Sequence, residues 1–157
     1  MSDRLLVATR KGLLVLDRQH QGHWHHAETH FLGEPVSIAL ADARDGTWYA
    51  ALNLGHFGVK MWRRPQGAPS WTACAAPVYP PQPEGEPAAR PATPDQPDRP
   101  PPAPWTLQQI WSLEAGGDDQ PGVLWAGTIP GGLFHSRDGG MSWSLNRPLW
   151  DRPERAE

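Results

Sequence analysis

The sequence has few of the features that mark the commonest protein classes. Cys74 is its only cysteine, so the chain has no second thiol for an internal disulfide or a CxxC site. No run of about 18 apolar residues occurs, which excludes a membrane-spanning helix. The apolar N-terminal stretch is interrupted by Arg4, Arg10 and Lys11 and therefore does not resemble a signal peptide. We expect a cytoplasmic protein without membrane contact.

Neither sign of charge is in strong excess. The chain has 14 Lys and Arg residues against 17 Asp and Glu residues, a formal net charge of -3. Nucleic-acid partners and anionic membranes select strongly basic surfaces. The charge balance therefore predicts no nucleic-acid partner.

Tryptophan, proline and glycine are abundant instead. The chain has 9 Trp against 3 Phe, together with 19 Pro and 16 Gly among its 157 residues. This composition favours many short strands joined by tight turns, and the length predicts a single domain. We therefore expect an all-β fold.

One pattern occurs three times: a short strand, a glycine-containing turn, a second strand, a polar turn and a tryptophan. Alternating or apolar runs mark the strands. The units run from Leu5 to Trp24, from Trp48 to Trp71 and from Val123 to Trp143. Further alternating runs at 35–40 and 107–113 precede the second and third units. With such lead-in strands, the pattern predicts about three four-stranded antiparallel units, as in propeller blades.

A proline-rich segment interrupts the repeat between the second and third units. Trp24 and Trp71 lie 47 residues apart, whereas Trp71 and Trp143 lie 72 residues apart. Residues 77–104 contain 12 prolines, which cannot donate to a sheet ladder. We therefore expect residues 77–104 to form a solvated, extended insertion with polyproline II character.

Residues 136–143, SRDGGMSW, fit the pattern S-x-D-x-G-x-[ST]-W. This segment resembles the Asp-box, or BNR repeat, of the sialidase-like β-propellers. The resemblance implies that residues 1–157 form the N-terminal portion of such a propeller, as about three blades of an incomplete ring. It also implies a structural rather than catalytic role for the box residues, which are Ser136, Asp138, Gly140 and Trp143. Three blades do not close a ring, so we expect either further blades or self-association.

Polar residues in the turns between the second and third strands of each unit are the candidates for ligand binding. Loops at one end of a propeller surround its central channel, where ligands usually bind. The candidates in these turns are Arg10, Asn53, His56 and Thr128, and Gln109 on the lead-in strand of the third unit could reach the same region. The alternative interpretation is that they are ordinary solvated turn residues.

Five histidines lie between residues 20 and 30, in the segment HQGHWHHAETH. Histidine clusters can bind zinc, but no fixed helical metal-binding spacing is present. We interpret the segment as a solvated loop and expect neither a metal nor a cofactor.

The catalytic residues of sialidases do not map onto this chain. The resemblance implies a tyrosine nucleophile paired with glutamate, an aspartic acid as acid/base, and three arginines that hold the sugar carboxylate. Tyr49 and Tyr79 are the only tyrosines, and Thr128 stands where the family's Arg-Ile-Pro motif has arginine. We therefore expect a protein that binds a small molecule or carbohydrate, or acts as a scaffold, without catalysis. The alternatives are a fragment of a sialidase-like glycoside hydrolase whose catalytic residues lie in missing blades, and an inactive truncated product.

Overall fold

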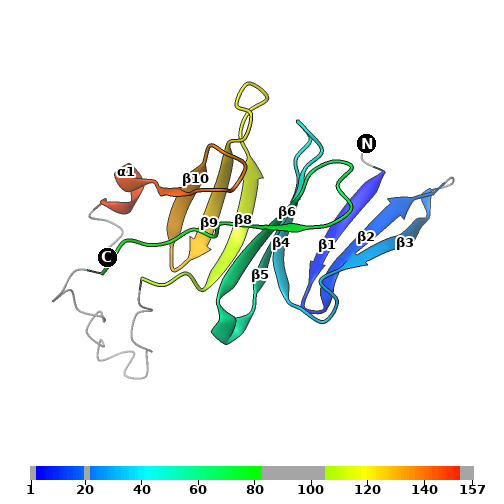
Figure 1. The fold of residues 1–157 in the computed structure, drawn as a ribbon, viewed down its shortest axis with the longest axis horizontal. Helices are drawn as coiled ribbons and strands as arrows, with labels where there is room; N and C mark the ends of the chain where they lie inside the picture. Colours follow the sequence, from blue (N-terminus) through cyan, green and yellow to red (C-terminus); the bar gives the residue numbers. More distant parts are fainter. Residues whose placement is uncertain (1–2, 20–21, 83–104, 153–157) are drawn as a thin grey trace.

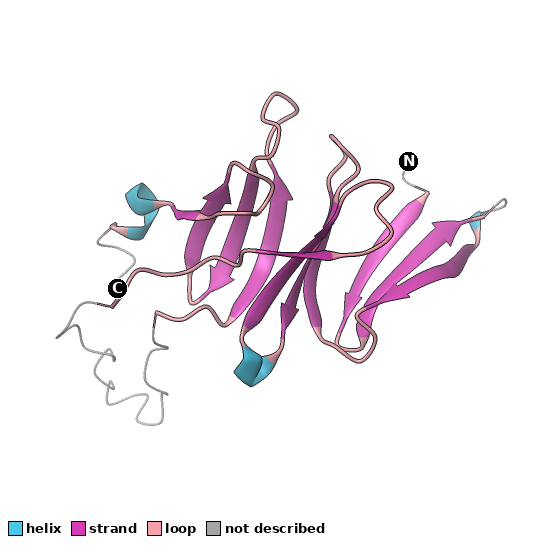
Figure 2. Ribbon diagram, in the orientation of Figure 1, coloured by secondary structure: helices cyan, strands magenta, loops and turns pink. Residues whose placement is uncertain are grey.

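The computed structural model describes residues 3–19, 22–82 and 105–152. Strands dominate these residues, and the helical segments are short; η2 (Gly55–Phe57) and α1 (Arg147–Trp150) are among them (Figure 2). The strands form three antiparallel sheets that lie in a row in chain order (Figure 1). The expectation of an all-β fold is confirmed.

The first sheet has three strands in the order β1-β2-β3, which corrects the expectation of a fourth strand there, because no lead-in strand precedes β1 among the described residues. They are β1 (Arg4–Thr9), β2 (Gly12–Arg18) and β3 (Trp24–His30). A two-residue turn joins β1 to β2, and Gly12 follows it with a φ of +132°. A Cβ atom on Gly12 would lie 2.8 Å from the carbonyl oxygen of His30, so this close approach requires glycine.

The second and third sheets are four-stranded meanders. The second is β4 (Val36–Ala41), β5 (Trp48–Asn53), β6 (Val59–Arg64) and β7 (Thr72–Cys74). The third is β8 (Gln109–Ala115), β9 (Leu124–Ile129), β10 (Gly132–Ser136) and β11 (Ser144–Leu145). The lead-in strands expected from the sequence are β4 and β8. Both carry a β-bulge at the same place, with Ser37 and Trp111 as the extra residues.

Apolar side chains fill the spaces between neighbouring sheets. Leu13 of β2 packs with Val36, Ala50 and Leu52 between the first and second sheets. A separate cluster fills the space between the second and third sheets, and its members are Tyr49, Ala51, Val59, Met61, Ile110, Leu113, Leu124 and Ala126. Alternate residues of β5 therefore enter different clusters, which explains why this strand is apolar on both faces.

A tryptophan before the last strand of the second and third sheets contacts the end of the preceding sheet. The Trp71 ring lies 5.6 Å from the ring of His30 and 5.0 Å from that of Phe31, where β3 ends. The Trp143 Nε1 donates to the carbonyl oxygen of Ala75, just after β7, at 2.9 Å. Trp24 differs, because no sheet precedes it among the described residues, and it is 40% exposed.

Arg44, which is ion-paired within its own turn, also joins the second sheet to the third by hydrogen bonds. The Arg44 guanidinium binds the Asp42 carboxylate at 2.6 Å and donates to the carbonyl oxygen of Val123 at 2.9 Å. It also donates to the carbonyl oxygen of Gln120 at 2.5 Å. The Asp42 side chain is only 3% exposed, and hydrogen bonding to Arg44 lowers its pKa. The turn after β4 is thereby tied to the turn after β8.

The first residues of the proline-rich segment are buried, which corrects the expectation of a solvated insertion from residue 77 onward. Pro77 is fully buried, and Tyr79 is 6% exposed within a cluster with Phe134 and Trp150. The Tyr79 hydroxyl hydrogen-bonds to Thr128 Oγ1 and donates to the carbonyl oxygen of Pro130. The aromatic ring supplies apolar area that the prolines alone do not offer. Residues 83–104 lie outside the described part of the chain.

Candidate functional site

The turns that carry the predicted ligand residues lie at one edge of the row of sheets. The β1–β2 turn, the η2 segment and the β9–β10 turn are all at the lower edge in Figures 1 and 2. Arg10 is exposed in the first of these turns, and Gln109 begins β8 opposite Ile129. The fold therefore brings the candidate residues to a shared edge, but distributes them over three different sheets.

Asn53 and His56 have local contacts within their turn. The Asn53 Oδ1 accepts a hydrogen bond from the Gly55 N–H at 3.3 Å, which shapes the turn after β5. The exposed His56 ring packs edge-on against Phe57, with the ring centroids 4.6 Å apart. Phe57 itself is 73% exposed. These side chains form a protruding turn rather than the wall of the cavity described below.

Thr128 is used inside the fold. Its side chain is 1% exposed, and Oγ1 contacts the Tyr79 hydroxyl and donates to the carbonyl oxygen of Gly132 at 3.1 Å. The hydroxyl therefore fixes the β9–β10 turn from within. A ligand outside the sheet would not reach it without displacing Tyr79.

Asp138 organises the Asp-box turn as its residue type predicts. Its Oδ1 accepts from the N–H groups of Met141 and Ser142 at 3.0 and 2.9 Å. The Ser142 hydroxyl donates to Oδ2 at 2.6 Å, and the Ser136 hydroxyl donates to Oδ1 at 2.8 Å. These hydrogen bonds, led by those from Ser142, lower the pKa of Asp138 to about 2. All of these partners belong to the turn of Asp138 itself.

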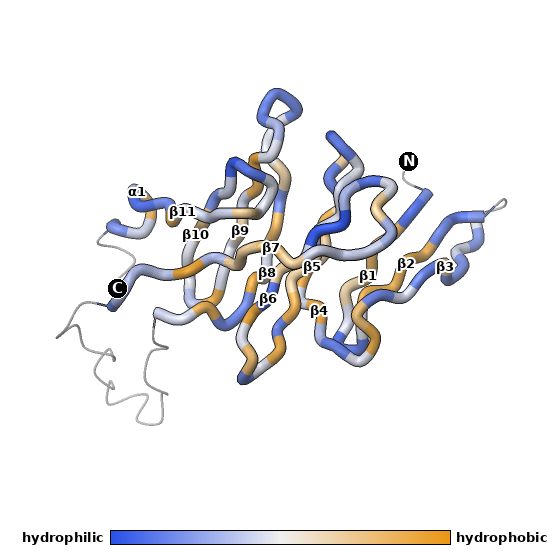
Figure 3. Tube along the Cα trace, viewed as in Figure 1, coloured by the Kyte–Doolittle hydropathy of each residue, from blue (hydrophilic) through white to orange (hydrophobic). Residues whose placement is uncertain are grey.

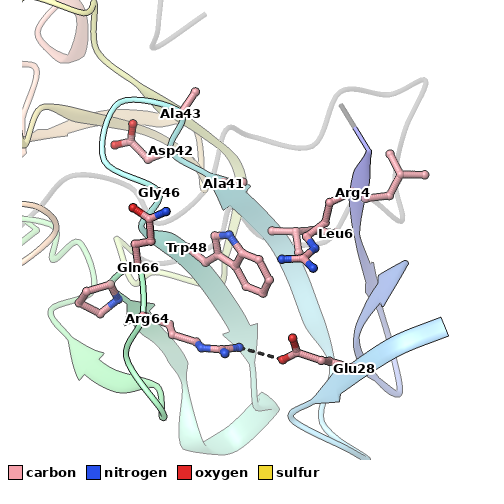
Figure 4. A pocket seen from close by; sticks show the side chains of 13 residues that line it. Arg4, Leu6, Glu28, Ala41, Asp42, Ala43, Gly46, Trp48, Arg64 and Gln66 are labelled. Carbon is pink, nitrogen blue, oxygen red and sulfur yellow. Dashed lines mark hydrogen bonds and ion pairs between the residues drawn. The ribbon is translucent and has the colours of Figure 1, made fainter. Parts of the chain in front are cut away.

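A cavity of about 700 Å³ lies between the first and second sheets (Figure 4). It lies near the starts of β1 and β5 and the end of β6, at the edge opposite the predicted ligand residues (Figure 1). Trp48 lies within this site (Figure 4). The polar side chains around it come from β1, β3, β6 and the adjoining turns; they are Arg4, Glu28, Asp42, Arg64 and Gln66. Sequence reasoning missed this site because its residues are scattered over strand ends. Their only signal in the sequence is that Arg4, Trp48 and Arg64 each lie at the end of a strand away from the candidate turns.

Two guanidinium groups contact the tryptophan at this site. The Cζ atoms of Arg4 and Arg64 lie 5.5 and 5.2 Å from the Trp48 ring centroid, within cation–π range. The Arg64 Nη1 also donates a hydrogen bond to Glu28 Oε2 at 3.0 Å, and this contact is drawn in Figure 4. That hydrogen bond lowers the pKa of Glu28, while burial lowers the pKa of the neighbouring His30. The site therefore combines a flat aromatic surface, fixed cations and an ionised carboxylate.

The histidines of β3 are bound to different partners. His25 Nδ1 contacts the carbonyl oxygen of Asp17 at 3.0 Å, and His26 Nε2 contacts Thr29 Oγ1 at 2.7 Å. His30 Nε2 lies 3.0 Å from Glu28 Oε2. Within residues 3–19, 22–82 and 105–152, no group of three metal-ligating side chains is placed to hold an ion.

Both tyrosines lie in apolar clusters. Tyr49 is 3% exposed between the second and third sheets, and burial raises its pKa to about 12. Tyr79 lies under the β9–β10 turn, as described above. A tyrosine nucleophile requires an accessible, activated hydroxyl. Neither tyrosine meets that requirement.

No protein-family model matches the chain, and no curated protein matches it either. Among the described residues, no helix has the length and apolar character needed to cross a bilayer.

Proposed function

We propose that the chain forms blades of a sialidase-like BNR-repeat β-propeller that binds a ligand without catalysing a reaction. The observation that carries this proposal is the repeated architecture of the second and third sheets. Both are four-stranded meanders with a bulge at the same place in the lead-in strand, and both place a tryptophan on the preceding sheet. The internal hydrogen bonding of Asp138 supports a structural role for the box.

The cavity beside Trp48 is the place that the geometry supports best for a ligand. Its volume of about 700 Å³ falls within the range of small-molecule sites. The turn residues Arg10, Asn53 and His56 form the competing site. Their side chains protrude from separate turns and offer less enclosure.

A carbohydrate is the ligand class that the cavity favours. A tryptophan ring offers a flat apolar surface for the C–H face of a sugar ring. The Glu28 carboxylate can accept hydrogen bonds from hydroxyl groups, and Gln66 and the two arginines can donate them. The lining combines two arginines, Arg4 and Arg64, with two carboxylates, Glu28 and Asp42, so neutral and acidic sugars are both candidates.

Catalysis is assigned to none of the described residues. The two tyrosines are buried, and the Asp138 carboxylate is engaged in its own turn. A glycoside hydrolase with its catalytic residues in further blades is the alternative function. No contact among the described residues favours it.

Saturation-transfer NMR with neutral hexoses and acidic sugars tests the proposal directly. Ala43→Trp adds an indole to the cavity wall and should abolish the transfer signal, because Ala43 is exposed at this wall. Ala73→Trp is the matched control, since Ala73 is exposed on β7 outside the cavity. The control should bind sugar as the unaltered chain does.

Two results would contradict the proposal in different ways. A signal lost in Asn53→Ala or His56→Ala but retained in Ala43→Trp would place the ligand at the turn edge. Absence of any signal with every sugar would exclude carbohydrate binding, and the scaffold role would then be the remaining form of the function.

A further inference from the structure

The charged side chains that line the cavity beside Trp48 all belong to ion pairs. Each pair joins one guanidinium to one carboxylate; the pairs are Arg4–Asp17, Arg64–Glu28 and Arg44–Asp42. Each pair contributes one charge of either sign, so the three together are balanced. The net charge of the cavity wall therefore depends on any further ionisable group in contact with these pairs.

His30 is such a group. Its Nε2 lies 3.0 Å from Glu28 Oε2 and 3.2 Å from Arg64 Nη1. Glu28 and Arg64 line the cavity, whereas His30 contacts them from outside the lining. Glu28 and His30 are two residues apart on β3, whose residues are mostly hydrophilic, in contrast to those of β1 and β2 (Figure 3). A charge on His30 is therefore felt directly by both members of one pair.

Neighbouring elements hold the imidazole of His30 in place. Its ring packs edge-on against Trp48 of β5 and Trp71, with ring centroids 6.4 and 5.6 Å apart. Register places Leu13 of β2 opposite His30. The side chain is nevertheless 17% exposed, so protons reach it from water. The ring is thus fixed in position and still able to ionise.

The charged groups that act on His30, among the described residues, are Glu28 of its own strand and Arg64 of β6. Burial lowers the pKa of His30 below its ordinary value of 6.5, so the ring is neutral at pH 7 and gains a proton on mild acidification. The Arg64 guanidinium lowers the pKa of Glu28, which stays ionised through this change. Of the three groups, His30 alone changes its charge near neutral pH.

Protonation of His30 alters how Glu28 is shared. Because Glu28 is ionised, the neutral ring donates its Nε2–H to Oε2, beside the hydrogen bond from Arg64. Protonation adds a charge to the ring, so two cations then contact a single carboxylate. These two cations repel each other, and the charge of Arg64 is no longer fully compensated.

We propose that His30 determines whether this cavity prefers a neutral or an acidic sugar. The inference rests on the proposed binding of a carbohydrate. With His30 neutral, the charges of the wall are balanced, and a neutral sugar leaves each ion pair intact. With His30 protonated, the wall has an excess positive charge, which the carboxylate of a sugar acid compensates. The preference for a sugar acid over a neutral sugar therefore rises as the pH falls.

NMR titration of the full chain with matched pairs of sugars tests this proposal. The probes are the methyl glycosides of glucose, galactose and mannose, each beside the uronide that has a carboxylate in place of the hydroxymethyl group. That carboxylate stays ionised between pH of about 8 and 5. For a sugar that binds, the ratio of uronide affinity to neutral affinity should rise by roughly threefold or more over this range. The midpoint of the rise should lie below pH 6.5.

His30→Gln keeps a nitrogen donor but does not ionise. Its affinity ratio should stay constant over the whole pH range, at the value that the unaltered chain has at pH of about 8. His26→Gln is the matched control, because His26 is exposed on the same strand and contacts Thr29 instead. This variant should show the full rise.

Three outcomes would overturn the proposal. A ratio that does not change with pH in the unaltered chain would do so while leaving sugar binding intact, and this result needs no variant to fold. A rise that persists in a folded His30→Gln variant would assign the effect to another group. Absence of binding by every sugar would refute the proposed function as well, so the two failures are distinguishable.

Discussion

Single residues at the turns determine how the strands connect. Asp138 is exposed, yet its carboxylate accepts two backbone N–H groups and two hydroxyl groups from residues 136–142. Ser136 is buried beside it, and its hydroxyl accepts from the Gly140 N–H at 2.9 Å. Such side-chain bonds satisfy backbone donors that the sheet leaves unpaired.

The stability of the fold should depend on the ionisation of Asp138 at acid pH. Its pKa is lowered from 3.8 to about 2, so the folded state binds this proton more weakly than the unfolded chain. The contribution of Asp138 is therefore complete above pH of about 4 and is lost as the pH falls toward about 2. Urea unfolding across this range should show a smaller loss of stability in Asp138→Asn than in the unaltered chain.

Asp118→Asn is the control for this measurement, because Asp118 lies in an exposed turn. This variant should keep the full pH dependence between pH of about 4 and 2. An Asp138→Asn variant with the same acid sensitivity as the unaltered chain would show that the box carboxylate does not stabilise the turn.

The Arg44–Asp42 ion pair, whose arginine also binds the third sheet, should be highly sensitive to substitution. Arg44→Ala leaves the 3%-exposed Asp42 carboxylate without its partner and should lower the free energy of unfolding by about 2 kcal/mol or more. Arg44→Lys keeps the charge but loses the planar fork that reaches both Asp42 and Val123, so an intermediate loss is expected. Thermal and urea unfolding measure both.

Arg137→Ala serves as the control for Arg44, because Arg137 is an exposed arginine in the box turn. Its stability should stay close to that of the unaltered chain. If Arg44→Ala were equally harmless, the Asp42 carboxylate would have to be hydrated or protonated without cost.

At the scale of elements, β5 and the segment after β7 have the largest structural roles. Four consecutive residues of β5, from Tyr49 to Leu52, are buried because neighbouring sheets cover both faces. Residues 75–82 have no regular secondary structure, yet they deliver Pro77 and Tyr79 to the third sheet. An irregular segment can therefore contribute to the core when it carries a buried aromatic residue.

Two segment replacements should separate the buried and remaining parts of the proline-rich stretch. Replacing 77–104 with a Gly/Ser segment of equal length removes Tyr79 and should cost about 3 kcal/mol or more in unfolding free energy. Replacing only 83–104 keeps Tyr79 and should have a much smaller effect, as the sequence predicts for a solvated tract. Equal losses in the two variants, measured by urea unfolding, would contradict this division.

At the scale of the whole molecule, the described residues cover the middle sheet on both faces, whereas they place a neighbouring sheet on one face of each end sheet. Local stability should follow this order, because opening a strand with two buried faces exposes more apolar area. Hydrogen exchange at neutral pH should be slowest in β5 and about tenfold or more faster in β3, which is largely exposed. Uniform protection across all three sheets would contradict the expected order.

The sequence by itself determined most of the secondary structure. Alternation of apolar and polar residues located the lead-in strands and the hairpins, because side chains of a strand point alternately to its two faces. The pattern SRDGGMSW identified the turn at Asp138, because its hydrogen bonds join residues within five positions of each other. Local chemistry of this kind is readable from local sequence.

Only the tertiary structure decided which side chains meet between sheets. Tyr79 and Thr128 are 49 residues apart in sequence, and no local pattern showed that the tyrosine is buried under the β9–β10 turn. Trp24 and Trp71 look equivalent in the repeat, yet the second packs on a preceding sheet and the first has none in the described fold. Arg4, Trp48 and Arg64 likewise meet through packing of the first two sheets. Such contacts depend on how sheets stack, and the residues of one strand do not encode that stacking.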